Sequence, residues 1–210
     1  IGFEGANING IFSKSNYKRS KFNTAYFFLF KSPINDMTIN PKAHVIVLVG
    51  LSGSGKSTIG AALSKQLNFS FIDVDDCVEE SEGISITEIF SQQGEGRFRE
   101  LERNTVLELD LSRPSVVALG GGAWMQDEIR DLFAPIASII YLEASTTSIL
   151  QRLKDNNKRP LLDDLAKRKE VLENQLETRK RVYAEADITV NANPVVPQVI
   201  REIIQKLKLS

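Results

Sequence analysis

The chain has 210 residues, 42% of them hydrophobic and 25% charged, with a formal net charge of −1. This composition is typical of one soluble globular domain, and the balanced charge argues against a partner such as nucleic acid or a membrane surface. The single cysteine and single histidine exclude an internal disulfide and a zinc site of usual composition. No apolar run approaches the roughly 18 residues that a membrane span needs. We therefore expect a protein of a reducing compartment, the cytoplasm.

Residues 1–36 differ from the rest of the chain. They hold five Lys and Arg against two acids, and eight of the fifteen Phe and Tyr residues, without a steady helical or strand period. Three interpretations remain open: a translated upstream stretch with Met37 as the natural start, an organelle-targeting peptide, or an additional structured arm. We favour the first, and expect residues 1–36 to be a leader, disordered or not native, and residues 37–210 to form the domain.

From Met37 onward, short apolar strands alternate with helices. Residues 44–49 read HVIVLV, and the continuous apolar run within them is typical of a parallel strand buried on both faces. The following elements are a helix, a strand at 69–74, a capping box that opens a helix at Ser85, and a long charged helix through Leu109. Further strands at 116–119, 138–142 and 187–190 are each followed by a helical segment, the last at 199–208. This alternation predicts a parallel sheet with helices on both faces.

The segment GLSGSGKST follows the first strand and opens the first helix. Gly50, four further residues, and then Gly55, Lys56 and Ser57 fit the phosphate-loop pattern in its strand–loop–helix context. Backbone N–H groups of such a loop surround phosphate oxygens at a helix N-terminus. Lys56 would contact the β- and γ-phosphates, and the Ser57 hydroxyl would ligate Mg²⁺. We infer that the chain binds a nucleoside triphosphate, and since a guanine motif Asn-Lys-x-Asp is missing, a small-molecule kinase is favoured.

Carboxylates suited to such a kinase occur in two places. Asp73 and Asp75 end the second predicted strand, where the alternation of side chains would put both on one face; a helix N-cap at Asp76 is the simpler alternative. Further along, Glu102 lies within the apolar stripe of a helix, and Arg99 precedes it by one turn as its expected partner. A solvated helix face with i,i+3 pairs is the alternative for that segment.

Two further arginines are placed to bind anions. Arg179 lies on an apolar helical face one turn before Tyr183, whereas Lys180 and Arg181 point elsewhere. Because a buried arginine needs a partner, we expect Arg179 to face an anion in a cleft. Arg159 belongs to the polar, proline-containing stretch 154–164, which is long enough to act as a lid.

Three consecutive glycines, 120–122, follow the buried strand at 116–119. One glycine suffices for a turn, so three in a row indicate a backbone that another group approaches closely. A flexible glycine-rich turn is the alternative.

The stretch from about residue 44 to 197 resembles shikimate kinase, in the nucleoside monophosphate kinase branch of phosphate-loop folds. The resemblance rests on segments in the family's order and nearly its spacing: GLSGSGKST, FIDVDD, IFSQQGEGRFRELE, ALGGGAW, YLE, KRPLL and ETRKRVYAEAD. It implies a three-layer α/β/α fold with a five-stranded parallel sheet of order 2-3-1-4-5 and a mobile lid. It also implies transfer of the ATP γ-phosphoryl group to the 3-hydroxyl of shikimate, a step toward chorismate and the aromatic amino acids.

The resemblance also implies roles for individual positions. The ATP-binding residues would be Gly53, Ser54, Gly55, Lys56, Ser57, Thr58, Arg152, Arg159 and Pro194. The metal would be held by Ser57 and, through water, by Asp73. The catalytic residues would be Lys56, Asp75 and Arg159, with Asp75 as the candidate base and Arg159 over the transferring phosphate. The acceptor would be bound by Asp75, Arg99, Gly121, Gly122 and Arg179, the two arginines holding its carboxylate.

Two other functions remain open. A kinase of another hydroxy acid, such as gluconate, would have much the same phosphate loop, and a catalytically inactive relative could keep the fold as a binding protein. Arg99 and Arg179 suit any acid acceptor, but the three glycines and KRPLL favour shikimate. We expect a monomer that binds ATP, Mg²⁺ and shikimate, and neither nucleic acid nor a membrane.

Overall fold

The computed structural model describes residues 42, 44–153 and 168–207 of the chain. The expected leader, 1–36, and the expected lid with Arg159 lie outside these described residues. The predictions made for both segments therefore stay predictions.

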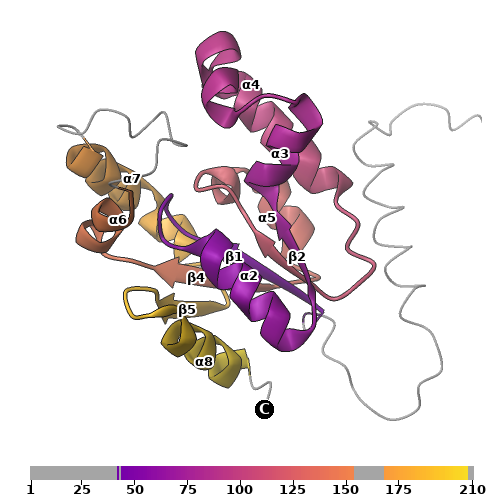
Figure 1. Ribbon diagram of the computed structural model, residues 1–210, viewed down its shortest axis with the longest axis vertical. Coiled ribbons are helices and arrows are strands. Elements are labelled where there is room, and N and C mark those ends of the chain that lie inside the picture. The colour runs from indigo at the N-terminus through magenta and orange to yellow at the C-terminus, as the bar shows by residue number, and fades with distance from the viewer. Residues whose placement is uncertain (1–41, 43, 154–167, 208–210) are drawn as a thin grey trace, which may run out of the picture. The chain divides into compact units, whose positions relative to one another are not determined.

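Five parallel strands form one sheet in the order β2-β3-β1-β4-β5 (Figure 1). The strands are β1 (Val45–Val49), β2 (Ser70–Asp73), β3 (Ser115–Ala118), β4 (Ser138–Glu143) and β5 (Ile188–Asn191). Every residue of β1, which pairs with β3 and β4, is buried. A strand buried on both faces reads as a continuous apolar run, which is why the sequence signal was clear. The predicted parallel sheet and its strand order are confirmed.

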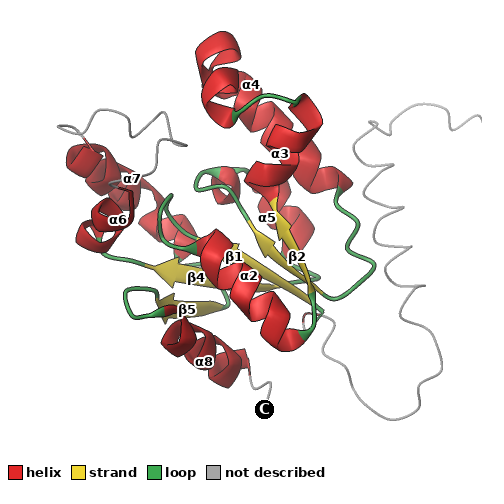
Figure 2. Ribbon diagram, in the orientation of Figure 1, coloured by secondary structure: helices red, strands yellow, loops and turns green. Residues whose placement is uncertain are grey.

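Helices connect the strands and pack against the sheet (Figure 2). They are α2 (Lys56–Leu67), α3 (Val74–Glu82), α4 (Ile86–Glu108), α5 (Asp127–Phe133), α6 (Thr146–Leu153), α7 (Arg168–Tyr183), α8 (Val196–Leu207) and the short 3₁₀ turn η2 (Ala123–Met125). Helices α2 and α8 lie side by side against one face of the sheet. None of the helices in the described part of the chain is long and apolar enough to span a membrane.

The second strand ends earlier than predicted. It stops at Asp73, and α3 begins at Val74, because the Asp73 side chain accepts a hydrogen bond from the Asp75 N–H at 3.0 Å and so caps the helix. Asp75 and Asp76 lie in the first turn, where negative charge is favourable near the helix N-terminus. The prediction that Asp73 and Asp75 share one face of a strand is therefore wrong, and so is the alternative N-cap at Asp76.

The capping box predicted at Ser85 is present at the start of α4. Ser85 Oγ accepts a hydrogen bond from the Glu88 N–H at 3.2 Å, and the Ser85 N–H donates to Glu88 Oε2 at 2.8 Å. Further along, α4 is kinked at Gly94, which has φ 80° and ψ 170°. A backbone with positive φ suits glycine, and the kink separates the capped turns from the stretch that carries Arg99 and Glu102.

Candidate active site

The chemistry-bearing segments follow the carboxyl ends of three neighbouring strands. Asp73, at the end of β2, is in register with Ala118 of β3, and Ala118 is in register with Leu48 of β1. The phosphate loop follows β1, and the three glycines follow β3. Parallel strands bring their carboxyl ends to one edge of the sheet, which is where open α/β folds bind ligands.

The loop between β1 and α2 has the geometry of an anion cradle. Gly53 and Gly55 have φ of 80° and 101°, values that glycine adopts readily and other residues rarely do. Helix α2 begins at Lys56, so the loop lies at its positive N-terminal end. The Lys56 ammonium donates to the carbonyls of Gly50 and Leu51 at 2.9 and 3.0 Å, so it already lies over the loop.

Side chains of the first turn of α2 differ in access to a ligand. Ser57 and Thr58 are exposed, whereas Ser54 is fully buried, and its hydroxyl has no hydrogen-bond partner in the described part of the chain. The Ser57 hydroxyl and the carboxylate of Asp73 are hard oxygen donors, the ligand type that Mg²⁺ prefers. The residues predicted for the metal therefore fit it chemically.

Arg152 connects the phosphate loop to the segment after β5. Its two terminal nitrogens donate to the carbonyls of Ser54, at 2.9 Å, and Ala192, at 2.6 Å. Ala192 precedes Asn193 and Pro194, so the structure brings Arg152 close to the segment that holds Pro194. The ATP-binding role that the resemblance implies for Arg152 and Pro194 stays a prediction.

Gly120, the first of the three glycines, lies beside two buried carboxylates. A Cβ atom added to it would overlap Glu102 Oε1 and would lie 2.9 Å from Asp75 Oδ1. Asp75 is 8% exposed, and Glu102 is fully buried. Asp75 of α3 and Glu102 of α4 thus both place a carboxylate at the end of β3. Only glycine at position 120 leaves room for these two groups.

Gly121 and Gly122 each lie against another part of the site. A Cβ atom on Gly121 would lie 2.8 Å from the backbone nitrogen of Ser52 in the phosphate loop, and one on Gly122 would lie 2.6 Å from the central carbon of the Arg99 guanidinium. The close approach predicted from three glycines is present, and the approaching groups are the protein's own. Both glycines are buried, so the alternative of a flexible turn is wrong.

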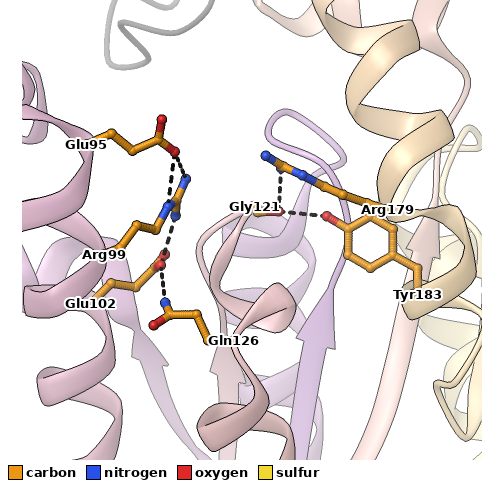
Figure 3. A network of polar contacts seen from close by, with 7 residues as sticks. All are labelled: Glu95, Arg99, Glu102, Gly121, Gln126, Arg179 and Tyr183. Atoms are coloured by element: carbon orange, nitrogen blue, oxygen red, sulfur yellow. Dashed lines mark hydrogen bonds and ion pairs between the residues drawn. The ribbon is translucent and has the colours of Figure 1, made fainter.

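Arg99 and Glu102 form the predicted pair, within a larger network (Figure 3). Arg99 Nη1 donates to Glu102 Oε2 at 2.8 Å, and Gln126 Nε2 donates to the same oxygen at 3.1 Å. The Nε and Nη2 atoms of Arg99 donate to Glu95 Oε1 at 3.3 and 3.0 Å. Burial opposes the charge on Arg99, but Glu102 and then Glu95 outweigh it and raise the pKa of the guanidinium. Glu102 therefore does not lie on a solvated helix face.

Arg179 lies inward, as its helical position predicted. Its Nη1 donates to the carbonyl oxygen of Gly121 at 2.9 Å, and the Tyr183 hydroxyl donates to the same oxygen at 2.7 Å (Figure 3). The tyrosine is fully buried, and this burial is the main cause that raises its pKa to about 12. Two cationic side chains, from α4 and α7, thus contact the same short turn after β3.

Sequence patterns did not identify several residues of this site. Ser52 occupies a position of the phosphate loop whose side chain the pattern does not specify, and Gln126 meets Glu102 across 24 positions of the chain. Tyr183 did carry a signal, because it lies four residues after Arg179 on the same helical face. We interpreted it only as a residue that packs.

We predict that Gly120→Ala destabilises the fold. The new methyl group would overlap Glu102 Oε1, and inserting an extra carbon into a well-packed site typically costs about 1–3 kcal/mol. Gly96→Ala is the matched control, since nothing lies within 4 Å of its added Cβ, and alanine in a helix should change stability by +1 kcal/mol at most. Urea denaturation of both variants measures the difference. Equal stabilities would contradict the packing described for Gly120.

The sequence is similar to that of one known enzyme family. The sequence model of the shikimate kinase family matches residues 52–208. A shikimate kinase of Sulfurihydrogenibium sp. is 40% identical over 164 residues, which are 78% of this chain and 97% of the relative.

Solved structures show the same similarity. The shikimate kinase from Acinetobacter baumannii, in complex with shikimate, matches with a TM-score of 0.76 and 31% identity, over 80% of this chain and 94% of that one. The shikimate kinase from Aquifex aeolicus matches with a TM-score of 0.68 and 35% identity, over 78% of this chain and 96% of that one. The resemblance identified from the sequence motifs is confirmed: the chain belongs to the shikimate kinase family.

Proposed function

We propose that this chain transfers the γ-phosphoryl group of ATP to the 3-hydroxyl of shikimate, giving shikimate 3-phosphate and ADP. One observation carries the proposal: Gly121 lies against Ser52 of the phosphate loop while its carbonyl accepts hydrogen bonds from α7, and Gly122 lies against Arg99. A donor site for phosphates and a cationic site for a carboxylate therefore share one turn. Relatives that cover most of this chain are named shikimate kinases, which supports the acceptor.

On the donor side, the residues of the phosphate loop would bind ATP. Lys56 would exchange its two carbonyl partners for the β- and γ-phosphate oxygens, which are stronger partners for an ammonium group. Ser57 and Asp73 would hold Mg²⁺, which neutralises phosphate charge when bound. Arg152 and Pro194 would contact the adenine, and Arg159, outside the described residues, would cover the transferring phosphate.

On the acceptor side, Arg99 and Arg179 would bind the carboxylate, and Gly121 and Gly122 would contact the acceptor directly. Asp75 would accept a hydrogen bond from the 3-hydroxyl, either as base or to position it. Little covalent chemistry is needed from the protein, because phosphoryl transfer depends mainly on positioning and on charge stabilisation.

The remaining expectations are part of the same proposal. We propose a monomer in the cytoplasm that serves the biosynthesis of aromatic amino acids and binds neither nucleic acid nor a membrane. The balanced net charge of −1 and the single cysteine support this proposal. Residues 1–36 would take no part in the reaction.

We predict that the protein releases ADP with shikimate far faster than with other acceptors. The measurement offers ATP and Mg²⁺ with shikimate, quinate, gluconate and nucleoside monophosphates separately. Turnover with gluconate but none with shikimate would contradict the acceptor, and inert protein with shikimate would contradict the activity altogether.

We predict that Arg179→Ala raises the KM for shikimate much more than the KM for ATP. Loss of a charge-assisted contact to the carboxylate should cost about 2–4 kcal/mol of apparent binding. Arg181→Ala is the matched control, because Arg181 is an exposed arginine two residues away on the same helix. Steady-state kinetics of both variants test the carboxylate role, and equal rises in the two KM values for Arg179→Ala would contradict it.

A further inference from the structure

The carbonyl group of Gly121 has two partners of different character. Tyr183 is fully buried, and its ring stacks on that of Tyr141, with centroids 4.9 Å apart and ring planes 12° apart. Tyr141 belongs to β4, which pairs with the central strand β1. Arg179 is only partly buried and carries a long, flexible side chain. The tyrosine is therefore the partner held in place by the sheet.

The planarity of the peptide bond extends this constraint to the next residue. In a trans peptide, the carbonyl of one residue and the N–H of the next point in opposite directions. The Gly121 carbonyl faces Arg179 and Tyr183, so the Gly122 N–H points away from α7. Figure 3 shows Arg99 on the other side of this turn from Tyr183. No hydrogen bond within the described part of the chain uses this N–H.

The surroundings of Gly122 complete an anion site. Its missing Cβ leaves the space that the Arg99 guanidinium occupies, so the backbone and this cation are in direct contact. A backbone N–H and a guanidinium that converge are donors suited to a carboxylate. The orientation of the peptide between Gly121 and Gly122 thus decides whether the N–H contributes to that site.

We propose that Tyr183 is a positioning residue for the acceptor: its hydroxyl holds the Gly121–Gly122 peptide so that the Gly122 N–H faces the carboxylate site beside Arg99. The inference rests on the proposed function and adds a residue to it. Arg179 gives the Gly121 carbonyl one of its five N–H donors, whereas Tyr183 gives it its single hydroxyl donor, so Tyr183 holds the peptide whether or not Arg179 turns to the acceptor carboxylate. Because burial raises the pKa of Tyr183 to about 12, its hydroxyl remains a donor at neutral and mildly alkaline pH.

The test compares Tyr183→Phe with Tyr141→Phe. Each variant loses one hydroxyl from the same stacked pair, but Tyr141 donates no hydrogen bond to another described residue. We expect Tyr183→Phe to raise the KM for shikimate about threefold to tenfold, the range for loss of one neutral hydrogen bond, with the KM for ATP unchanged. Tyr141→Phe should leave both KM values unchanged.

The outcomes separate this inference from the function on which it rests. If the unsubstituted protein turns over shikimate while Tyr183→Phe keeps its KM, or raises both KM values in parallel, the positioning role is wrong and the kinase function stands. If the unsubstituted protein does not use shikimate, the proposed function itself fails.

A second measurement needs no substitution. In protein labelled with ¹⁵N-glycine, shikimate should shift the amide signal of Gly122, because its N–H gains a carboxylate partner. The amide signal of Gly96, which lies in a helix with nothing within 4 Å of its Cβ position, serves as the control. An unshifted Gly122 signal at saturating shikimate would overturn the inference even if the Tyr183 variant did not fold.

Discussion

The absence of side chains at 120–122 allows three separate segments, α3, α4 and the phosphate loop, to meet at the end of β3. Asp75 and Glu102 approach Gly120, the phosphate loop approaches Gly121, and Arg99 approaches Gly122. A single methyl group at any of the three would meet another atom at less than 3.0 Å. The phosphate loop meets this turn through backbone atoms of Ser52, so the distance between the loop and the turn is set by close backbone packing, while Arg99 meets the turn through its guanidinium.

Charge in this site is distributed between buried and exposed partners. The pair of Arg99 with Glu102 is anchored by a fully buried carboxylate that also accepts from Gln126. The pair of Arg99 with Glu95 is different, since the Glu95 side chain is 49% exposed, and exposed pairs contribute only about 0–1 kcal/mol. An incoming anion can replace such a contact at small cost, while Glu102 keeps the guanidinium in place.

Periodicity and motif spacing were enough to predict most of the fold and part of the site. The parallel sheet, the phosphate loop, the pair of Arg99 with Glu102 and the inward Arg179 follow from apolar runs, from motif spacing and from the cost of burying an unpaired charge. The strand order followed only from the resemblance to shikimate kinase. The end of β2 was predicted wrongly, because the Asp73 cap starts a helix where alternation suggested a strand. The contacts of Gln126 and Ser52 depend on how distant segments pack, which local sequence does not encode.

The most direct test of this account is a crystal structure of the chain with shikimate and ADP. The account predicts that the shikimate carboxylate lies between the guanidinium groups of Arg99 and Arg179 and accepts from the Gly122 N–H, while the Gly121 carbonyl keeps its hydrogen bond from Tyr183. Shikimate bound with its carboxylate away from both arginines, and with Arg179 still on the Gly121 carbonyl, would contradict it.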